Sequence, residues 1–143
     1  MPIDLTWDVL PPGVHNGVVT EVDFKFGSCV GIVITYRTPH DGIDYFVSEW
    51  LTLDAPKNSP SYNETAQGKG RLKQLYEAHN LPLPKALEPA EIINKLVGKA
   101  FRLRVTTKRV NGLAAPKIAG ILGPADKPVP PRSSDFPDDG GPI

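Results

Sequence analysis

Apolar and polar residues alternate in three successive segments of the first half of the chain, after an irregular opening over residues 1–13. A period of two is typical of half-buried β-strands, because successive side chains point to opposite faces. Gly27-Ser28 and Asp41-Gly42 supply turn residues between the segments. The pattern predicts three strands in a meander, over residues 18–26, 30–37 and 44–53.

The spacing of apolar residues then changes to that of helices. Apolar positions recur at helical intervals between residues 65 and 79, with charged residues between them. Pro89 suits the first turn of a second, shorter helix that Gly98 would end. Alternation returns afterwards, and Asn111-Gly112 is the strongest hairpin signal in the chain. We therefore expect a helical connection followed by two paired strands, over residues 99–110 and 113–122.

Five short strands with a helix between the third and the fourth predict a mainly β protein. This order matches the five-stranded Greek-key barrel called the OB fold. Another small barrel, or a β-sandwich with a helical insert, is the alternative. We expect one domain over residues 1–123 and a flexible Pro- and Asp-rich tail over residues 124–143, where little can enter a core.

The third predicted strand divides its apolar residues between two faces. One face is core-like although Glu49 interrupts it, and its apolar members are Val47, Leu51 and Leu53. Phe46 and Trp50 lie on the other face, so we expect them to form an exposed platform on which bases stack. The alternative, in which both rings fill a small core, stays open. Weaker candidates of the same kind are Tyr36 and Arg37, whereas the rings predicted for the core are Trp7, Phe24, Phe26, Tyr76 and Phe101.

Charge is segregated along the chain although the formal net charge is zero. Residues 1–56 contain two basic and eight acidic residues, a net charge of −6. Residues 57–117 contain twelve basic and four acidic residues, a net charge of +8, and residues 135–143 carry −3. A basic middle and an acidic end favour a polyanion site with a separate acidic ligand. Solvated faces that differ in sign by chance are the alternative.

Basic residues recur on one face of the fourth predicted strand. Arg102 and Arg104 are two residues apart and Lys108 continues the row, while Lys117 on the partner strand joins it if the register allows. Such a row suits a phosphate backbone, because each contact releases a condensed counterion. An ordinary solvated strand face is the alternative. Three bases near the start of the predicted helix are expected either to widen the basic surface or merely to solvate the helix: Lys69, Arg71 and Lys73.

Catalytic and metal-binding motifs are absent from the sequence. The three histidines are far apart, and neither HExxH nor CxxC occurs. The single Cys29 cannot form an internal disulfide. We expect a protein that is not an enzyme, holds no cofactor or metal, and lacks a secretory signal or membrane span, which indicates the cytoplasm.

The chain ends in SSDFPDDGGPI, which places acids and one ring on a Pro- and Gly-rich segment. Together with the strand order, this ending resembles the single-stranded DNA-binding proteins of bacteria and their phages, and it is most similar to the small phage-encoded OB-fold group. Residues 68–84 and 96–105 also resemble the helix-then-strand region of that group. The matching tail positions are Asp135, Phe136, Asp138, Asp139, Pro142 and Ile143.

The resemblance implies sequence-nonspecific binding of single-stranded DNA in replication, recombination and repair. The resemblance also implies a tail that recruits partner proteins. It is compatible with a homodimer or higher oligomer, and it implies that a phage-encoded protein lies in the host cytoplasm. The chain departs from the group at Gly140-Gly141 and at its final Ile143, where Phe is more usual. The alternative function is that of a non-catalytic structural or adaptor module that binds another protein.

Overall fold

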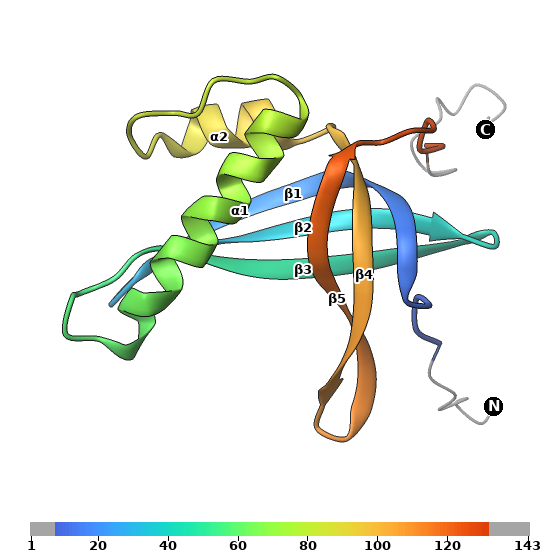
Figure 1. The fold of residues 1–143 in the computed structure, drawn as a ribbon, viewed down its shortest axis with the longest axis horizontal. Helices are drawn as coiled ribbons and strands as arrows, with labels where there is room; N and C mark the ends of the chain where they lie inside the picture. Colours follow the sequence, from blue (N-terminus) through green and yellow to red (C-terminus); the bar gives the residue numbers. More distant parts are fainter. Residues whose placement is uncertain (1–7, 132–143) are drawn as a thin grey trace, which may run out of the picture.

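The computed structural model describes residues 8–131 and is mainly β, with one five-stranded antiparallel sheet and short helices (Figure 1). The predicted order of three strands, a helical connection and two strands is confirmed. The elements are β1 (Gly13–Phe26), β2 (Val30–His40), β3 (Ile43–Asp54), η1 (Pro60–Glu64), α1 (Thr65–Ala78), α2 (Pro89–Leu96), β4 (Ala100–Val110) and β5 (Leu113–Pro124).

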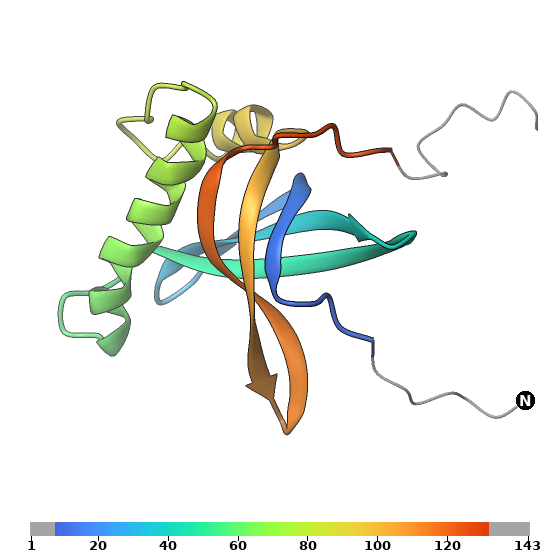
Figure 2. The same ribbon diagram turned by 45° about the vertical axis from the view of Figure 1, so that its right-hand side comes forward.

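The sheet has the strand order β3-β2-β1-β4-β5. The central strand β1 is shared: residues 13–18 pair with β4, and residues 18–26 pair with β2. As a result β4 and β5 run across the direction of β2 and β3 (Figures 1 and 2). The strands β3 and β5 form the two edges of the sheet, and α1 contacts both of them.

The hairpins predicted at Asp41-Gly42 and Asn111-Gly112 are present with two-residue turns. Asp41 and Asn111 each adopt a φ of 51°, and the glycine after each has a positive φ as well. This conformation matches the twist of the flanking strands and is tolerated by Asn, Asp and Gly. The β4–β5 hairpin projects away from the helices (Figures 1 and 2).

The helices end where the sequence predicts. Asn80 follows α1 with a φ of 56°, and Leu81 donates its backbone N–H to the Tyr76 carbonyl at 2.9 Å, a C-terminal arrangement that satisfies a helix carbonyl. Pro89 starts α2, and Gly98 with a φ of 88° follows its end. A 3₁₀ turn, η1, lies between β3 and α1.

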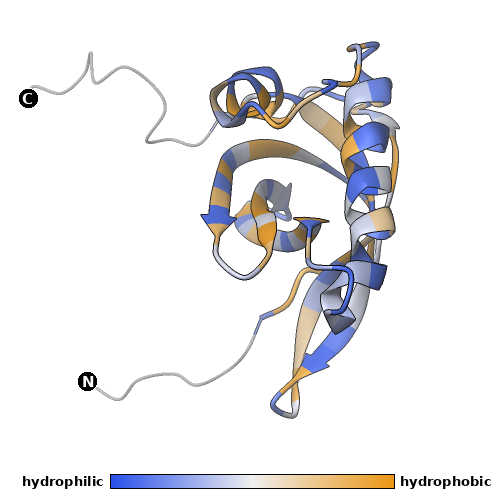
Figure 3. Ribbon diagram, turned by 90° about the vertical axis from the view of Figure 1, so that its left-hand side faces the viewer, coloured by the Kyte–Doolittle hydropathy of each residue, from blue (hydrophilic) through white to orange (hydrophobic). Residues whose placement is uncertain are grey.

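The core lies between the inner face of the sheet and the two helices. Hydropathy changes from residue to residue along the strands (Figure 3), and the inward positions are closely packed. The helix α1 approaches β3 through Gly68, because a Cβ at this position would overlap the carbonyl oxygen of Thr52. The buried residues of the hydrophobic core include Val19, Val22, Ile34, Val47, Leu51, Leu53, Leu72, Leu75, Tyr76, Ile92, Leu96, Phe101 and Leu103.

Three predictions about the N-terminal half are wrong. The first strand begins at Gly13 and not at residue 18 as predicted, and Leu10, in the segment predicted to be irregular, is fully buried. A β-bulge between Val19 and Glu21 shifts the alternation, so Val19 enters the core in place of its neighbours. Phe26 is 65% exposed, because it lies at the end of β1 beyond the core and stacks on Phe24.

Hydrogen bonds to the sheet extend beyond residue 123. Ala125 donates its backbone N–H to the Ala100 carbonyl at 3.1 Å, and Asp126 accepts a 2.8 Å hydrogen bond from Asn16. The predicted tail residues Asp135, Phe136, Asp138, Asp139, Pro142 and Ile143, and also Trp7, lie outside the described residues. No helix in residues 8–131 has the length and apolar character needed to cross a membrane.

Candidate nucleic-acid interface

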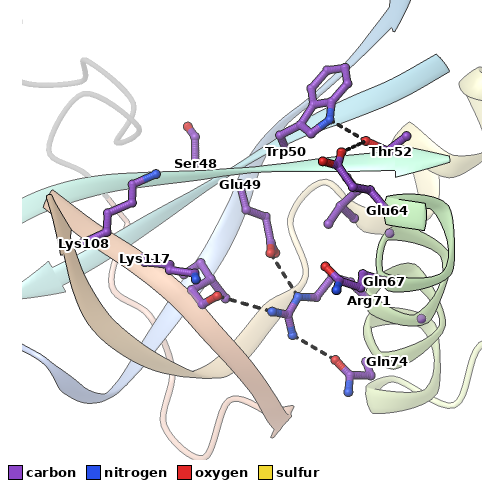
Figure 4. Close-up of a pocket in the computed structure, with 14 residues that line it drawn as sticks. Ser48, Glu49, Trp50, Thr52, Glu64, Gln67, Arg71, Gln74, Lys108 and Lys117 are labelled. Carbon is purple, nitrogen blue, oxygen red and sulfur yellow. Dashed lines mark hydrogen bonds and ion pairs between the residues drawn. The ribbon is translucent and has the colours of Figure 1, made fainter. Parts of the chain in front are cut away.

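A groove of about 730 Å³ opens at the seam between β3 and β5 (Figure 4). The strand β3 supplies its floor, the helix α1 forms one wall, and the β4–β5 hairpin forms the other (Figure 4). The residues that line it include Trp50, Glu64, Gln67, Arg71, Lys108 and Lys117.

The predicted aromatic platform is exposed, as expected from the alternation of β3. Phe46 and Trp50 are 48% and 45% exposed, whereas the apolar residues of the opposite face are buried. Trp50 lies at the end of the groove where α1 begins (Figure 4). Its indole N–H donates a 2.8 Å hydrogen bond to Thr52 Oγ1, so the face of the ring remains the part that a ligand can meet.

Two of the predicted cations face this groove from the hairpin wall. Lys117 pairs in register with Thr106, two residues before Lys108 on β4, so the register places both lysines on the same side of the hairpin. Both are exposed and line the groove, and neither forms an ion pair with any residue of the described range. The strand register therefore allows Lys117 to join the row of basic residues on β4, as the prediction required.

The two arginines of β4 differ in their surroundings. Arg104 is exposed and has no ion pair within residues 8–131. The Nη1 atom of Arg102 lies 4.0 Å from a carboxylate oxygen of Asp126, and this side chain is less than half exposed. Among the described residues, the guanidinium of Arg104 is therefore left without an ion pair, while that of Arg102 is partly neutralised by Asp126 in the segment after β5.

Tyr36 and Arg37 are not available to a ligand, contrary to the prediction. Tyr36 is fully buried and its hydroxyl donates a 2.8 Å hydrogen bond to Glu49 Oε2. Arg37 is 5% exposed and its Nη1 lies 3.4 Å from Asp44 Oδ1. A ring inside the core cannot stack on a base, and a buried guanidinium beside a carboxylate cannot reach a phosphate.

The guanidinium of Arg71 forms hydrogen bonds within the protein and is not free to contact DNA. Its Nε donates to Glu49 Oε1 at 3.0 Å, Nη1 donates to Gln74 Oε1 at 2.9 Å, and Nη2 donates to the Ile118 carbonyl at 3.3 Å (Figure 4). The guanidinium therefore ties α1 to both edge strands. Of its helix neighbours, Lys69 is exposed outside the groove lining, and Lys73 lies 3.7 Å from Glu77.

Glu49 is the residue whose role the sequence did not reveal. Burial raises the pKa of its carboxyl, while the Arg71 guanidinium and the Tyr36 hydroxyl act in the opposite direction. Burial also raises the pKa of Tyr36 well above its ordinary value, and the adjacent Glu49 charge adds to this. The available signal was a lone acid on an apolar strand face together with a lone base, Arg71, on the buried side of a helix.

No family model matches the chain, and no curated protein matches it. Within residues 8–131 no cluster of three or more His, Cys, Asp or Glu side chains could hold a metal ion. The geometry of the groove therefore carries the functional argument.

Proposed function

We propose that the chain binds single-stranded DNA without regard to sequence and without changing it chemically. The observation that carries the proposal is the meeting of an exposed indole, Trp50, with two lysines, Lys108 and Lys117, that form no ion pair within residues 8–131, in one groove. Rings stack on the faces of bases and contribute about 1–3 kcal/mol per base, while cations bind phosphates. Every base has a flat face, so the contact tolerates any sequence.

The fold supports the proposal through its strand order. A central β1 shared between β2 and β4, and a helix between β3 and β4, are the features expected of an OB-type barrel. The helix α1 contacts both edge strands, which is where such a barrel would close. Barrels of this type bind oligonucleotides on the face of their second and third strands, where Phe46 and Trp50 lie.

The acidic end of the chain fits a second part of the proposal. Residues 135–143 carry a net charge of −3 and resemble the partner-recruiting tails of phage and bacterial single-stranded DNA-binding proteins. We infer that this segment recruits proteins of replication, recombination or repair in the cytoplasm where the DNA is copied. A homodimer or higher oligomer would coat a strand more completely than isolated molecules would.

A fluorescence titration tests the DNA-binding proposal. The chain has two tryptophans, so the Trp7→Phe variant reports Trp50 alone, and Trp50→Phe is the matched control. Adding oligo-dT should quench Trp50 strongly, and duplex DNA of the same length should bind more weakly at equal salt.

Two results would contradict the proposal. Equal affinity for duplex DNA would indicate general binding to phosphates. No response to oligo-dT at low ionic strength would favour the alternative hypothesis, an adaptor that binds acidic proteins. A quench confined to the Trp50→Phe variant would move the interface away from the groove.

A further inference from the structure

The indole of Trp50 is held on more than one side although almost half of it is exposed. Its Nε1 donates to Thr52 Oγ1 at 2.8 Å, and the same Thr52 hydroxyl donates onward to Glu64 Oε2 at 3.2 Å (Figure 4). One hydroxyl thus accepts a hydrogen bond and donates another. These two hydrogen bonds connect the Trp50 ring on β3 to Glu64, the residue that precedes α1.

Thr52 is itself fixed by the packing of the helix. Its side chain is buried, and Gly68 of α1 lies against its backbone so closely that a Cβ at position 68 would overlap it. Since Glu64 lies just before the same helix, the acceptor at the end of the chain is carried by the element that packs on Thr52. The hydroxyl therefore has little freedom to turn away.

The third support is a missing side chain beneath the ring. A Cβ on Gly31 of β2 would overlap the outer atoms of the indole, Cζ2 and Cη2. The ring consequently lies directly over the backbone of the neighbouring strand. Any other residue at this position would push the indole away from Thr52.

We propose that Thr52, Glu64 and Gly31 are positioning residues that hold the Trp50 ring in one orientation, ready to receive a base. The base-receiving part rests on the proposed function, whereas the immobilisation of the ring does not. A ring that is already ordered avoids the cost of ordering it on binding, which amounts to about 2- to 12-fold in affinity for one side chain.

The first experiment uses the protein alone, in the Trp7→Phe background. Thr52→Val keeps the shape of the side chain and removes both hydrogen bonds. Thr38→Val is the matched control, because Thr38 is also buried in a strand and its hydroxyl has no hydrogen-bond partner within the described residues. Time-resolved fluorescence anisotropy should show added nanosecond motion of Trp50 in the Thr52 variant and none in the control.

A second variant covers the case in which Thr52→Val does not fold. Glu64→Ala changes an exposed residue and removes only the far acceptor, so we expect the same effect on the ring with a smaller amplitude. Fast motion of the indole in the parent protein, or equal motion in the parent and in both variants, would overturn the proposal.

The second experiment measures the affinity for oligo-dT. Thr52→Val should weaken binding about 2- to 12-fold, and Thr38→Val should leave it unchanged. When Trp50 is already Ala, adding Thr52→Val should have no further effect, since the hydroxyl acts only through the ring. An equal loss in both backgrounds would mean a general structural role and would overturn the proposal.

The two experiments separate this proposal from the proposed function. Parent protein that ignores oligo-dT but shows an immobile ring, released by Thr52→Val, would refute DNA binding while confirming the support of the indole. Parent protein that binds oligo-dT with a mobile ring would do the reverse.

Discussion

Removing Lys108 and Lys117 together should change how DNA binding responds to salt. Each cation that neutralises a phosphate of a single strand adds about 0.7 to the slope of log affinity against log salt. Both lysines line the groove and neither is paired with a carboxylate in residues 8–131. The double alanine variant should therefore lower the magnitude of the slope by about 1.4.

This slope has a direct consequence for affinity. Between 50 and 200 mM salt the variant should lose about 7-fold less affinity than the parent, because a fourfold change in salt is raised to the power of about 1.4. Oligo-dT titrations followed by Trp50 fluorescence at four salt concentrations are sufficient to measure the difference.

The matched control changes the same charge elsewhere. Lys57 and Lys85 are exposed, lie in loops and do not line the groove. Their double alanine variant has the same net charge as the Lys108 and Lys117 variant. Equal slopes for the two variants would show that total charge governs binding, and would refute the placing of phosphates on the hairpin wall.

Four further predictions concern the arginines of β4, the buried Glu49–Arg71 pair and the acidic C-terminal segment. Arg104→Ala should lower the salt slope by about 0.7, whereas Arg102→Ala should lower it less because Asp126 already lies near that guanidinium; equal effects in the titration would argue against this. Arg71→Met should lower the free energy of unfolding in urea by about 3–5 kcal/mol, since among residues 8–131 it leaves buried Glu49 with Tyr36 as its one side-chain partner; a loss below about 1 kcal/mol would contradict a structural ion pair. The raised pKa of Glu49 makes the folded state hold a proton above the ordinary value of 4.5, so the stability that this group contributes is complete below pH 4.5 and is lost as pH rises through the folded pKa. The stability advantage of the parent over Glu49→Gln, from urea unfolding at several pH values, should accordingly shrink as pH rises, and growth of that difference would be the wrong sign. Deleting residues 133–143 should leave the affinity for oligo-dT unchanged or higher, since it removes only negative charge, while capture of replication proteins is lost; a large drop in affinity would contradict this.

Local chemistry explains why the strands and hairpins could be predicted. Asp41-Gly42 and Asn111-Gly112 determine their own backbone conformation, so the two turns hold whatever surrounds them. The alternation in β3 likewise identified the exposed rings, because every second residue of an unbulged strand faces the same way. Alternation gave the wrong faces in β1 because the bulge at Val19 adds one residue to the strand. Residues before the bulge therefore point to the opposite face from the one predicted.

Long-range pairing explains what could not be predicted in the site. Glu49 and Arg71 are 22 residues apart, and Arg71 and Ile118 are 47 apart. When its partner is unknown, a single charged residue such as Arg71 is equally compatible with an exposed surface. The sequence therefore predicts Arg71 as part of the basic DNA-binding surface. Tyr36 is predicted as a ring that could stack on bases, but the ring is buried and its hydroxyl belongs to the same network as Glu49 and Arg71.

The commitment of Arg71 to the fold makes the two walls of the groove unequal. The helix wall presents the amides Gln67 and Gln74, and Glu64 lies beside the indole of Trp50, while the hairpin wall presents Lys108 and Lys117 (Figure 4).

On the proposed function, phosphates lie along the hairpin, and bases turn toward the indole, where a carboxylate repels phosphate. A single strand has this same asymmetry, with charge along one side and flat faces along the other. A duplex carries phosphates on both outer sides and encloses its bases, so one wall of the groove would always meet the wrong group. Preference for single strands then follows from the unequal walls and needs no contact that reads a base.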